Sequence, residues 1–234
     1  SSVYLATQTV HGKLMKLAAA VLQVGEDDLE MEEGEIRITG EQGDSVTFSD
    51  LATMMNGVPG FKLPDGIEAG LEATHYFQPS QAAYANGSHV AEVEVDIETG
   101  AVKILRYVVA HDCGNLINPL IVDGQVQGGV AHGIGNALLE HLYYDENANP
   151  LTTTFAEYLL PTAELVPNVE ILHLESPTPN NPLGVKGAGE GGTLPAAAVI
   201  AAAIDDALST FGVRFKDVPI RPHQIVAAIN EANN

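Results

Sequence analysis

The sequence has few cysteines, few basic residues and no long apolar run. Its 234 residues include one cysteine, Cys113. One cysteine excludes a disulfide framework, and it excludes an iron–sulfur cluster held by this chain alone, which needs about four ligands. The most apolar stretch, from Pro195 to Leu208, is interrupted by Asp205 and Asp206. It stays short of the roughly 18 residues that suggest a membrane span, so we expect no membrane association.

Basic residues number 10 against 31 acidic ones, a formal net charge of -21. Such a surface repels phosphate backbones and anionic lipids, which argues against a role on nucleic acid or at a membrane surface. An anionic cofactor would have to be held by backbone N–H groups, helix N-termini or the rare cations.

The residues after Ser1 contain neither a basic region nor a long apolar segment, so they do not form a secretory signal. We therefore expect a cytoplasmic protein, with export to the periplasm alongside a partner chain left open. The sequence also begins without Met, which is compatible with a processed piece, an expression fragment or a natural split subunit.

The first third predicts a helix, a hairpin and a second short helix. Apolar residues at helical spacing form one stripe that ends before a capping glycine, Gly25: Leu14, Leu17, Ala18, Val21 and Leu22. Residues 29–31 and 36–38 flank a Glu33-Gly34 turn. A short helix is expected from Ser49, and residues 56–66 read as a loop because they are rich in Gly and Pro.

The remainder predicts a mixed α+β fold. Residues 93–97 alternate apolar and acidic side chains, and after a Thr99-Gly100 turn residues 102–110 return as a second strand. Asn118-Pro119 is a strong helix start, and that helix should run towards Glu140. Further strands are expected at 142–144, 155–159 and 169–175, and helices at 195–211 and 222–229. Without βαβ alternation, we expect mixed sheets with packed helices rather than a doubly wound sheet.

Two glycine-rich stretches stand apart from core material: residues 124–135 inside the long predicted helix, and residues 184–193 before the next one. Each glycine in a helix costs roughly 1 kcal/mol relative to Ala, so some group must need close access to the backbone. The second stretch is neither a P-loop nor a Rossmann fingerprint, because its Lys186 precedes the glycines and no strand leads in. Its one carboxylate, Glu190, is either a helix N-terminal charge or a general base.

The motifs together resemble the molybdenum hydroxylases, the family of xanthine dehydrogenase, aldehyde oxidase and carbon monoxide dehydrogenase. Residues 184–193 (GVKGAGEGGT) are similar to the segment around that family's active-site glutamate. Residues 112–119 (DCGNLINP) with 124–129 (GQVQGG) are similar to its cofactor-contacting helix. The likeness is dense from about Gln78 to the C-terminus and identifies the chain with the C-terminal part of the molybdopterin-binding large subunit. We accordingly divide it into segments 1–77 and 78–234 of one cofactor-binding region.

The resemblance implies a role for several residues. Glu190 would be the base that deprotonates a water-derived ligand of the molybdenum. Gly124 and Gln125 would contact the cofactor, with Gln125 hydrogen-bonded to the metal centre or the pterin. The backbone at Lys186, Gly187 and Gly189 would shape the pocket, and Ser1 and Ser2 would be the remnant of a pterin-holding loop. The metal would be held by the pterin's sulfurs and by no side chain directly.

The implied reaction is hydroxylation of an electron-poor carbon with oxygen from water. Its cofactor would be molybdenum-molybdopterin, alone or as a dinucleotide, and electrons would pass to iron–sulfur clusters and FAD on partner domains or chains. Purines, aldehydes, N-heterocycles and carbon monoxide all stay open as substrates. The family's upstream glycine-rich loop and arginine segment are not found here, so we expect the chain to be inactive without the rest of the subunit.

Two other classes of function remain open. The chain could be a non-catalytic assembly module that docks partner subunits, or a hydrolase that uses a carboxylate pair such as Glu157 and Glu190. His111, His132 and His141 form no tight ligand set and are interpreted as structural or surface residues. The remaining candidates are interpreted as packing residues: Cys113, Tyr143, Tyr144 and Tyr158.

Overall fold

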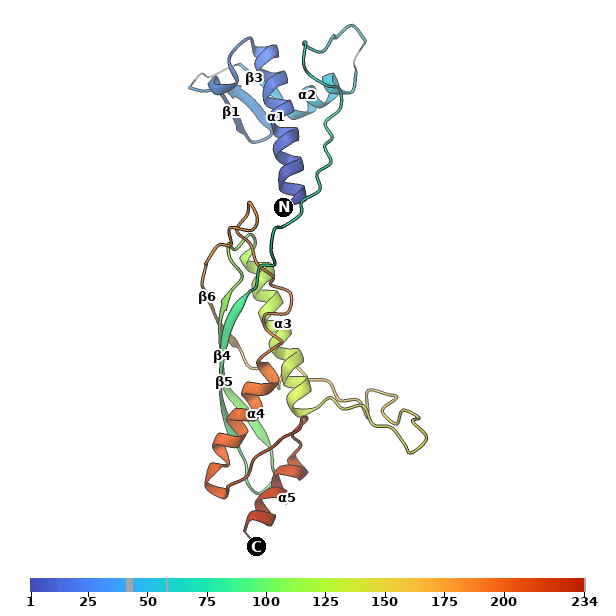
Figure 1. Ribbon diagram of the computed structural model, residues 1–234, viewed down its shortest axis with the longest axis vertical. Coiled ribbons are helices and arrows are strands. Elements are labelled where there is room, and N and C mark those ends of the chain that lie inside the picture. Colours follow the sequence, from blue (N-terminus) through green and yellow to red (C-terminus); the bar gives the residue numbers. More distant parts are fainter. Residues whose placement is uncertain (41–43, 58, 234) are drawn as a thin grey trace. The chain divides into compact units, whose positions relative to one another are not determined.

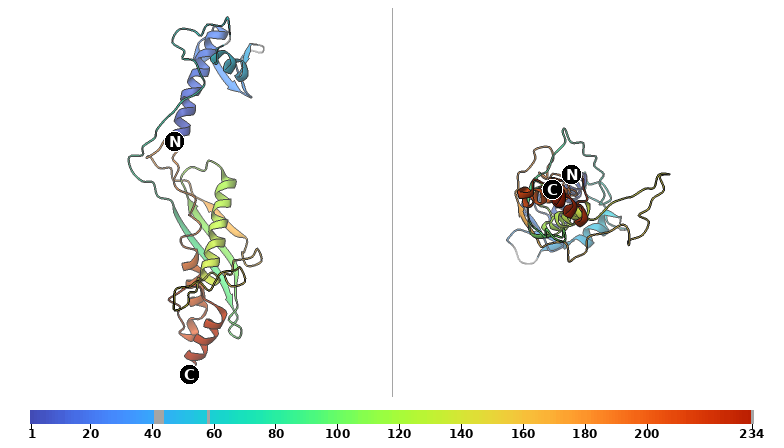
Figure 2. Two further views of the ribbon diagram at one scale, coloured as in Figure 1. Left: turned by 90° about the vertical axis from the view of Figure 1, so that its right-hand side faces the viewer. Right: turned by 90° about the horizontal axis from the view of Figure 1, so that it is seen from below.

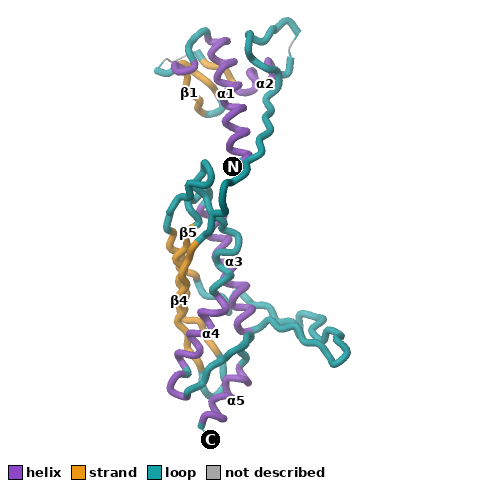
Figure 3. The backbone as a smooth tube through the Cα atoms, viewed as in Figure 1, coloured by secondary structure: helices purple, strands orange, loops and turns teal. Residues whose placement is uncertain are grey.

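The computed structural model describes residues 1–40, 44–57 and 59–233, and these form two compact units. The first spans Ser1–Pro79 and the second Ser80–Asn234. Each is described by itself. Helices and small sheets occur in both (Figures 1 and 3), so the α+β prediction is confirmed. In the described part of the chain, no helix has the length and apolar character needed to cross a bilayer.

The N-terminal unit packs two helices against a small antiparallel sheet. Helix α1 (Ser2–Leu22) and helix α2 (Phe48–Met55) accompany strands β1 (Leu29–Glu32), β2 (Glu35–Ile38) and β3 (Ser45–Thr47), in the order β1-β2-β3. A 3-10 turn, η1 (Glu26–Asp28), precedes β1. The hairpin is as predicted. The core is formed by side chains from both helices and β2: Leu17, Ile36, Leu51 and Met55.

The end of α1 corrects one prediction. Gln23 is the C-terminal cap, with φ 59°, and the amide of Val24 bonds to Ala19 O at 3.1 Å. Gly25 instead precedes η1 in extended geometry, with φ -70°. Helix α1 ends at Leu22 because Gln23 takes the left-handed conformation. The sequence had predicted that conformation for Gly25, since glycine adopts it at least cost.

The sheet of the C-terminal unit has the order β4-β5-β6 (Figure 1). Strand β4 (Asn86–Val95) pairs antiparallel with β5 (Val102–Asp112), which confirms the predicted hairpin. Strand β6 (Val169–His173) pairs parallel with β5. The chain between β5 and β6 contains helix α3 (Pro119–Leu138), so one β-α-β connection is present although none was expected. The sequence pattern did not indicate this connection because some 30 residues without helix or strand separate α3 from β6.

Helices cover one face of this sheet, as Figure 1 shows for α3 and α4 (Ala196–Ala207). Asn118 caps α3, its side chain accepting from the Ile121 amide at 3.2 Å, and Pro119 is the first helical residue as predicted. Helix α4 is followed by η2 (Ser209–Phe211) and the predicted stop at Gly212, and α5 (Pro222–Ala232) ends the unit. One core joins β5 to the helices through Tyr107, Val109, Ile134, Ile200 and Ile225.

Residues 139–168 form an arm that extends away from the body of this unit (Figure 2, from below). The strands predicted at 142–144 and 155–159 are wrong: the arm has only an isolated bridge between Tyr144 and Pro150, and turns elsewhere. Apolar side chains there are exposed, Phe155 at 78%. Their pattern suggested strands, but the described part of this unit offers them no neighbouring strand to pair with.

Candidate functional site

The segment that carries Glu190 connects β6 to α4 and is bonded to the residues just after β5. Val185 forms an isolated bridge with Gly114. The amide of Lys186 donates to Cys113 O at 2.7 Å, and the amide of Asn115 donates to Gly184 O at 3.2 Å. These bonds hold the glycine-rich stretch 184–193 next to residues 113–118. Helix α3, which contains the other glycine-rich stretch, follows directly after those residues.

A buried carboxylate anchors this junction. Asp112, 7% exposed, accepts the Ser176 hydroxyl at 2.5 Å and the Gly114 amide at 2.9 Å. Lys186 Nζ lies 3.1 Å from Asp112 Oδ2, with both side chains about nine-tenths buried. The pKa of Asp112 is held well below its usual range, by the Ser176 hydroxyl first, then the Gly114 amide, with Lys186 contributing. The carboxylate therefore stays ionised and ties three segments together.

Glycines let the backbone of residues 191–196 lie directly on α3 and β5. A Cβ at Gly129 would lie 2.7 Å from Gly192 C, and one at Gly133 would lie 2.2 Å from the Ala196 Cβ. A Cβ at Gly191 would lie 2.2 Å from Nε2 of His111. Gly129 and Gly133 are thus needed for close packing between α3 and residues 184–196, the Glu190 segment. The sequence had predicted that some group lies close to the helix backbone, without saying which.

A pocket of about 650 Å³ lies beside residues 187–191. It is lined by residues 83–87 leading into β4, by His111, by residues 187–191 and by Leu194 and Pro195. Glu190 is exposed on its wall. Among the hydrogen bonds of the described residues, none uses the amides of Gly187, Ala188, Gly189 or Glu190 as donor. Consecutive free N–H groups beside a cavity form a concave surface suited to anionic or polar ligands.

The structure brings some of the predicted site residues together and not others. Glu190, Gly187 and Gly189 line this pocket. Gly124 and Gln125 lie exposed on α3 and are not among its lining residues. The side chain of Lys186 also lies elsewhere, on Asp112. The serines belong to the N-terminal unit, where the Ser2 hydroxyl accepts from the Phe77 amide at 3.1 Å and Ser1 O from the Leu5 amide at 3.0 Å.

His111 lines the pocket, although its sequence context predicted only a structural or surface residue. It is 1% exposed and lines the same pocket as Glu190. The available signal was its place at the end of an apolar strand, directly before Asp112-Cys113. His132 is exposed on α3, and His141 stacks on Tyr143 with ring centroids 3.8 Å apart. Cys113 is a buried free thiol whose pKa is raised, chiefly by burial, in keeping with a packing residue.

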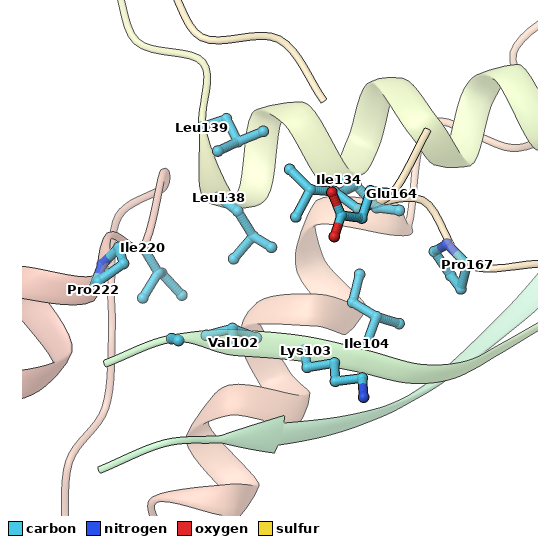
Figure 4. Close-up of a pocket in the computed structure, with 12 residues that line it drawn as sticks. Val102, Lys103, Ile104, Ile134, Leu138, Leu139, Glu164, Pro167, Ile220 and Pro222 are labelled. Carbon is cyan, nitrogen blue, oxygen red and sulfur yellow. The ribbon is translucent and has the colours of Figure 1, made fainter. Parts of the chain in front are cut away.

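A second pocket, of about 480 Å³, lies between the turn end of β5, the end of α3 and the residues before α5 (Figure 4). Its walls are mainly apolar, with Ile104, Leu138 and Ile220 among them. Lys103 and Glu164 are its only charged lining residues. The Glu190 pocket, with its carboxylate beside unbonded backbone amides, is the better candidate for chemistry.

Comparison with known proteins assigns the family. Residues 1–167 match the model of a molybdopterin cofactor-binding domain. The chain belongs to this family. Among curated relatives it is 39% identical, over 95% of its length, to the nicotine 6-hydroxylase large subunit of Paenarthrobacter nicotinovorans. It is 34% identical, over its whole length, to the carbon monoxide dehydrogenase large chain of Hydrogenophaga pseudoflava.

Solved structures agree with this assignment to the molybdopterin cofactor-binding domain family. Quinoline 2-oxidoreductase from Pseudomonas putida 86 superposes with a TM-score of 0.82 at 38% identity over 96% of this chain. The chain spans 27% and 28% of the two curated relatives and 28% of that structure. It thus corresponds to little more than a quarter of such proteins.

The Glu190 pocket fits the family's cofactor by its own geometry. A Cβ at Gly187 or Gly189 would meet no atom of this chain within 4 Å, so the wall has room for a bound group. The unbonded amides beside them suit a polar pterin. No set of three or more His, Cys, Asp or Glu side chains in the described ranges could hold a metal ion.

Proposed function

We propose that this chain forms the Glu190 wall of the active site in a molybdenum hydroxylase. When bound, the molybdenum–pterin group would supply the oxidation chemistry, in which an electron-poor carbon gains a hydroxyl oxygen from water. The observation that carries the proposal is the position of Glu190: one carboxylate beside four unbonded amides, in a chain of the molybdopterin family.

Each group of the pocket would have a distinct task. Glu190 would accept a proton at a side-chain carboxylate oxygen during each turnover. The amides of residues 187–189 would hydrogen-bond the cofactor's polar edge. Gln125, on the adjacent face of α3, would contact the cofactor from the helix, and Gly124 would allow close approach there. Ser1 and Ser2 stay predicted cofactor-binding residues. The Asp112–Lys186 pair would hold the whole segment in place.

The substrate class we propose is a small molecule with an electron-poor carbon, such as an N-heterocycle, an aldehyde or a purine. N-heterocycles are the first class to assay, because a nicotine 6-hydroxylase and a quinoline 2-oxidoreductase are among the relatives. The partners we propose are the remainder of the molybdopterin subunit and iron–sulfur and FAD domains or subunits. Carbon monoxide dehydrogenase large chains are also relatives, so carbon monoxide belongs in the same panel.

Replacing Glu190 with Gln in the native complex tests the role of the carboxylate. We expect molybdenum and pterin contents to stay near the wild-type values, because the amides and glycines are kept. Turnover should fall by about 10²- to 10⁴-fold, since Gln cannot accept the proton. The control is Glu98→Gln, which changes an exposed glutamate in the β4–β5 turn of the same unit. Metal analysis, pterin analysis and steady-state kinetics give the measurements.

Other outcomes of this experiment favour the alternatives. A native complex without molybdenum, indifferent to Glu190→Gln, would identify an assembly module and refute the catalytic proposal. A hydrolase would show activity without cofactor and lose it on Glu157→Gln as well. The structure disfavours that pair: Glu157 lies on the arm, where it accepts the Thr154 hydroxyl at 2.7 Å, and it is not among the lining residues of the Glu190 pocket.

A further inference from the structure

Three histidines form a row on the helix-covered face of the C-terminal sheet. His89 lies on β4, His111 on β5 and His173 on β6, and all three are at least partly buried. His111 and His173 are register partners, and their ring centroids are 6.5 Å apart. Tyr107 lies on the same face, its hydroxyl 2.9 Å from Nδ1 of His89. The row therefore crosses the sheet beneath α3 and the Glu190 segment.

Three ring nitrogens of His111 and His173 are buried and have no hydrogen-bond partner among the described residues: His111 Nδ1, His111 Nε2 and His173 Nδ1. Buried polar groups in folded proteins are almost always bonded, to protein or to ordered water. A neutral imidazole has one donor and one acceptor nitrogen, so His111 needs one partner of each kind. Several unpaired nitrogens in one polar region are the usual setting for buried water.

The part of the row from His111 to His173 leads from the pocket to a partly exposed residue. His111 lines the pocket, and its Nε2 lies against the backbone of Gly191, next to Glu190. At the other end, His173 Nε2 lies 2.6 Å from Oδ1 of Asp123 on α3. The Asp123 side chain is 43% exposed, against 20% for His173. Polar groups thus lead from the lining of the pocket to a partly exposed carboxylate.

The proposed reaction requires an exit for protons. Its net balance is R–H + H2O → R–OH + 2 H⁺ + 2 e⁻, and the two electrons leave for iron–sulfur and flavin acceptors. Two protons therefore have to leave the pocket in each turnover, and Glu190 has to lose its proton before it can act as a base again. This argument rests on the role proposed for Glu190.

We propose that His111, His173 and Asp123, with water between the two rings, form a proton path from the Glu190 pocket to solvent. Each imidazole takes a proton at one nitrogen and releases another from its second nitrogen, so no net charge is stored. The proton then passes from His173 Nε2 to Asp123 and to bulk water. His89, bonded to Tyr107, lies beside this path and is not part of it.

The charges around His111 favour a neutral ring. Burial lowers the pKa of His111 most, nearby His173 lowers it further and Asp112 raises it. Burial also lowers the pKa of His89. Among the titratable groups near the row, Tyr107 bonds to His89 and Asp123 bonds to His173, while Asp112, paired with Lys186, directly follows His111. A neutral imidazole with both nitrogens available is the form that can relay a proton.

The test uses the native complex carrying His111→Gln or Asp123→Asn. We expect unchanged molybdenum and pterin contents and about a tenfold loss of turnover at low buffer concentration. The solvent deuterium isotope effect should rise, and added imidazole, a small diffusible proton carrier, should restore part of the turnover. His132→Gln is the matched control, because His132 is an exposed histidine of the same unit. A crystal structure of the wild-type complex should show water between His111 and His173.

Two outcomes of this test overturn the proposal. Wild-type turnover in both variants at every buffer concentration would exclude a path through these residues. A loss that neither buffer nor imidazole alters would indicate a structural role. If His111→Gln loses the cofactor, the turnover of Asp123→Asn decides whether the path exists, because that substitution changes only the partly exposed end of the path. If Glu190→Gln stops turnover while both path variants behave as wild type, the path fails and the proposed function stands. If Glu190→Gln keeps turnover, the proposed function itself fails.

Discussion

At the scale of single residues, the site depends on groups that hold the Glu190 segment rather than on Glu190 alone. Asp112 accepts hydrogen bonds from residues 114 and 176 and pairs with Lys186, four positions before Glu190. The backbone of Lys186 was predicted to shape the pocket, and it directly precedes the lining residues 187–191. Its side chain instead bonds to Asp112 and so holds the Glu190 segment. A buried pair of this kind is sensitive to the loss of one partner.

Replacing Asp112 with Ala should lower the free energy of unfolding of the C-terminal unit by about 3 kcal/mol, because a buried ammonium loses its partner. Hydrogen exchange of β5 amides measures this. The pH dependence has a defined sign: the folded-state pKa of Asp112 is lowered, so its contribution is present above the ordinary value of about 3.9 and is lost as pH falls below it. Asp112→Asn should lack that acid-dependent component.

The control for this prediction is Asp65→Asn, because Asp65 is fully exposed in its ion pair with Lys62. Surface pairs contribute about 0–1 kcal/mol, so this change should leave the stability nearly unaltered. An equal effect of the two substitutions, or an Asp112→Ala protein as stable as the wild type, would show that Asp112 is not an anchor.

At the scale of elements, the contact between α3 and the start of α4 determines where the pocket wall lies. Four of the glycines in α3 fall into two groups. Gly129 and Gly133 lie against residues 192–196, whereas a Cβ at Gly124 or Gly128 would meet no atom of this chain within 4 Å. Intrinsic propensity disfavours all of them in a helix, so the close-contact glycines are explained by packing.

This contrast predicts opposite effects for two substitutions in one helix. Gly133→Ala should destabilise the C-terminal unit by about 2 kcal/mol, because the new methyl group would overlap the Ala196 Cβ. Gly128→Ala should stabilise it by up to about 1 kcal/mol through helix propensity. Urea unfolding of the two variants beside the wild type is the measurement. Equal tolerance of both would mean that α3 and α4 can separate without cost.

At the scale of the whole chain, the excess of acidic residues dominates the electrostatics. The net charge of -21 is spread over 234 residues, and the acidic residues of the run 26–35 are exposed on η1 and the first hairpin. Self-repulsion of this size opposes a compact state. It also explains why an anionic ligand here would depend on backbone amides, such as those of residues 187–190, rather than on the overall field.

The melting temperature should therefore rise when NaCl is increased from about 10 mM to about 150 mM, as the Debye length falls from about 30 Å to about 8 Å. Thermal scans at fixed pH measure this. Sucrose at matched osmolality is the control, since it stabilises without screening charge. A melting temperature that falls with salt would mean that attractive ion pairs outweigh the repulsion.

Local signals were sufficient for most elements. The Asn118-Pro119 start, the Thr99-Gly100 turn and the stop at Gly212 each depend on a few adjacent residues, and all three are found. The resemblance in residues 112–129 and 184–193 identified the family, which the comparisons confirm. The two strands expected in 139–168 failed because strand formation needs a partner strand, which an apolar pattern does not reveal.

The sequence by itself determined the family, the α+β class and the main helices and hairpins, because caps, turns and apolar periodicity act between near neighbours. Only the tertiary structure decided which long-range groups meet. It paired Lys186 with Asp112 across 74 positions, brought His111 beside the Glu190 segment and aligned His111 with His173. Such contacts arise from the parallel pairing of β6 with β5, and no local pattern encodes them.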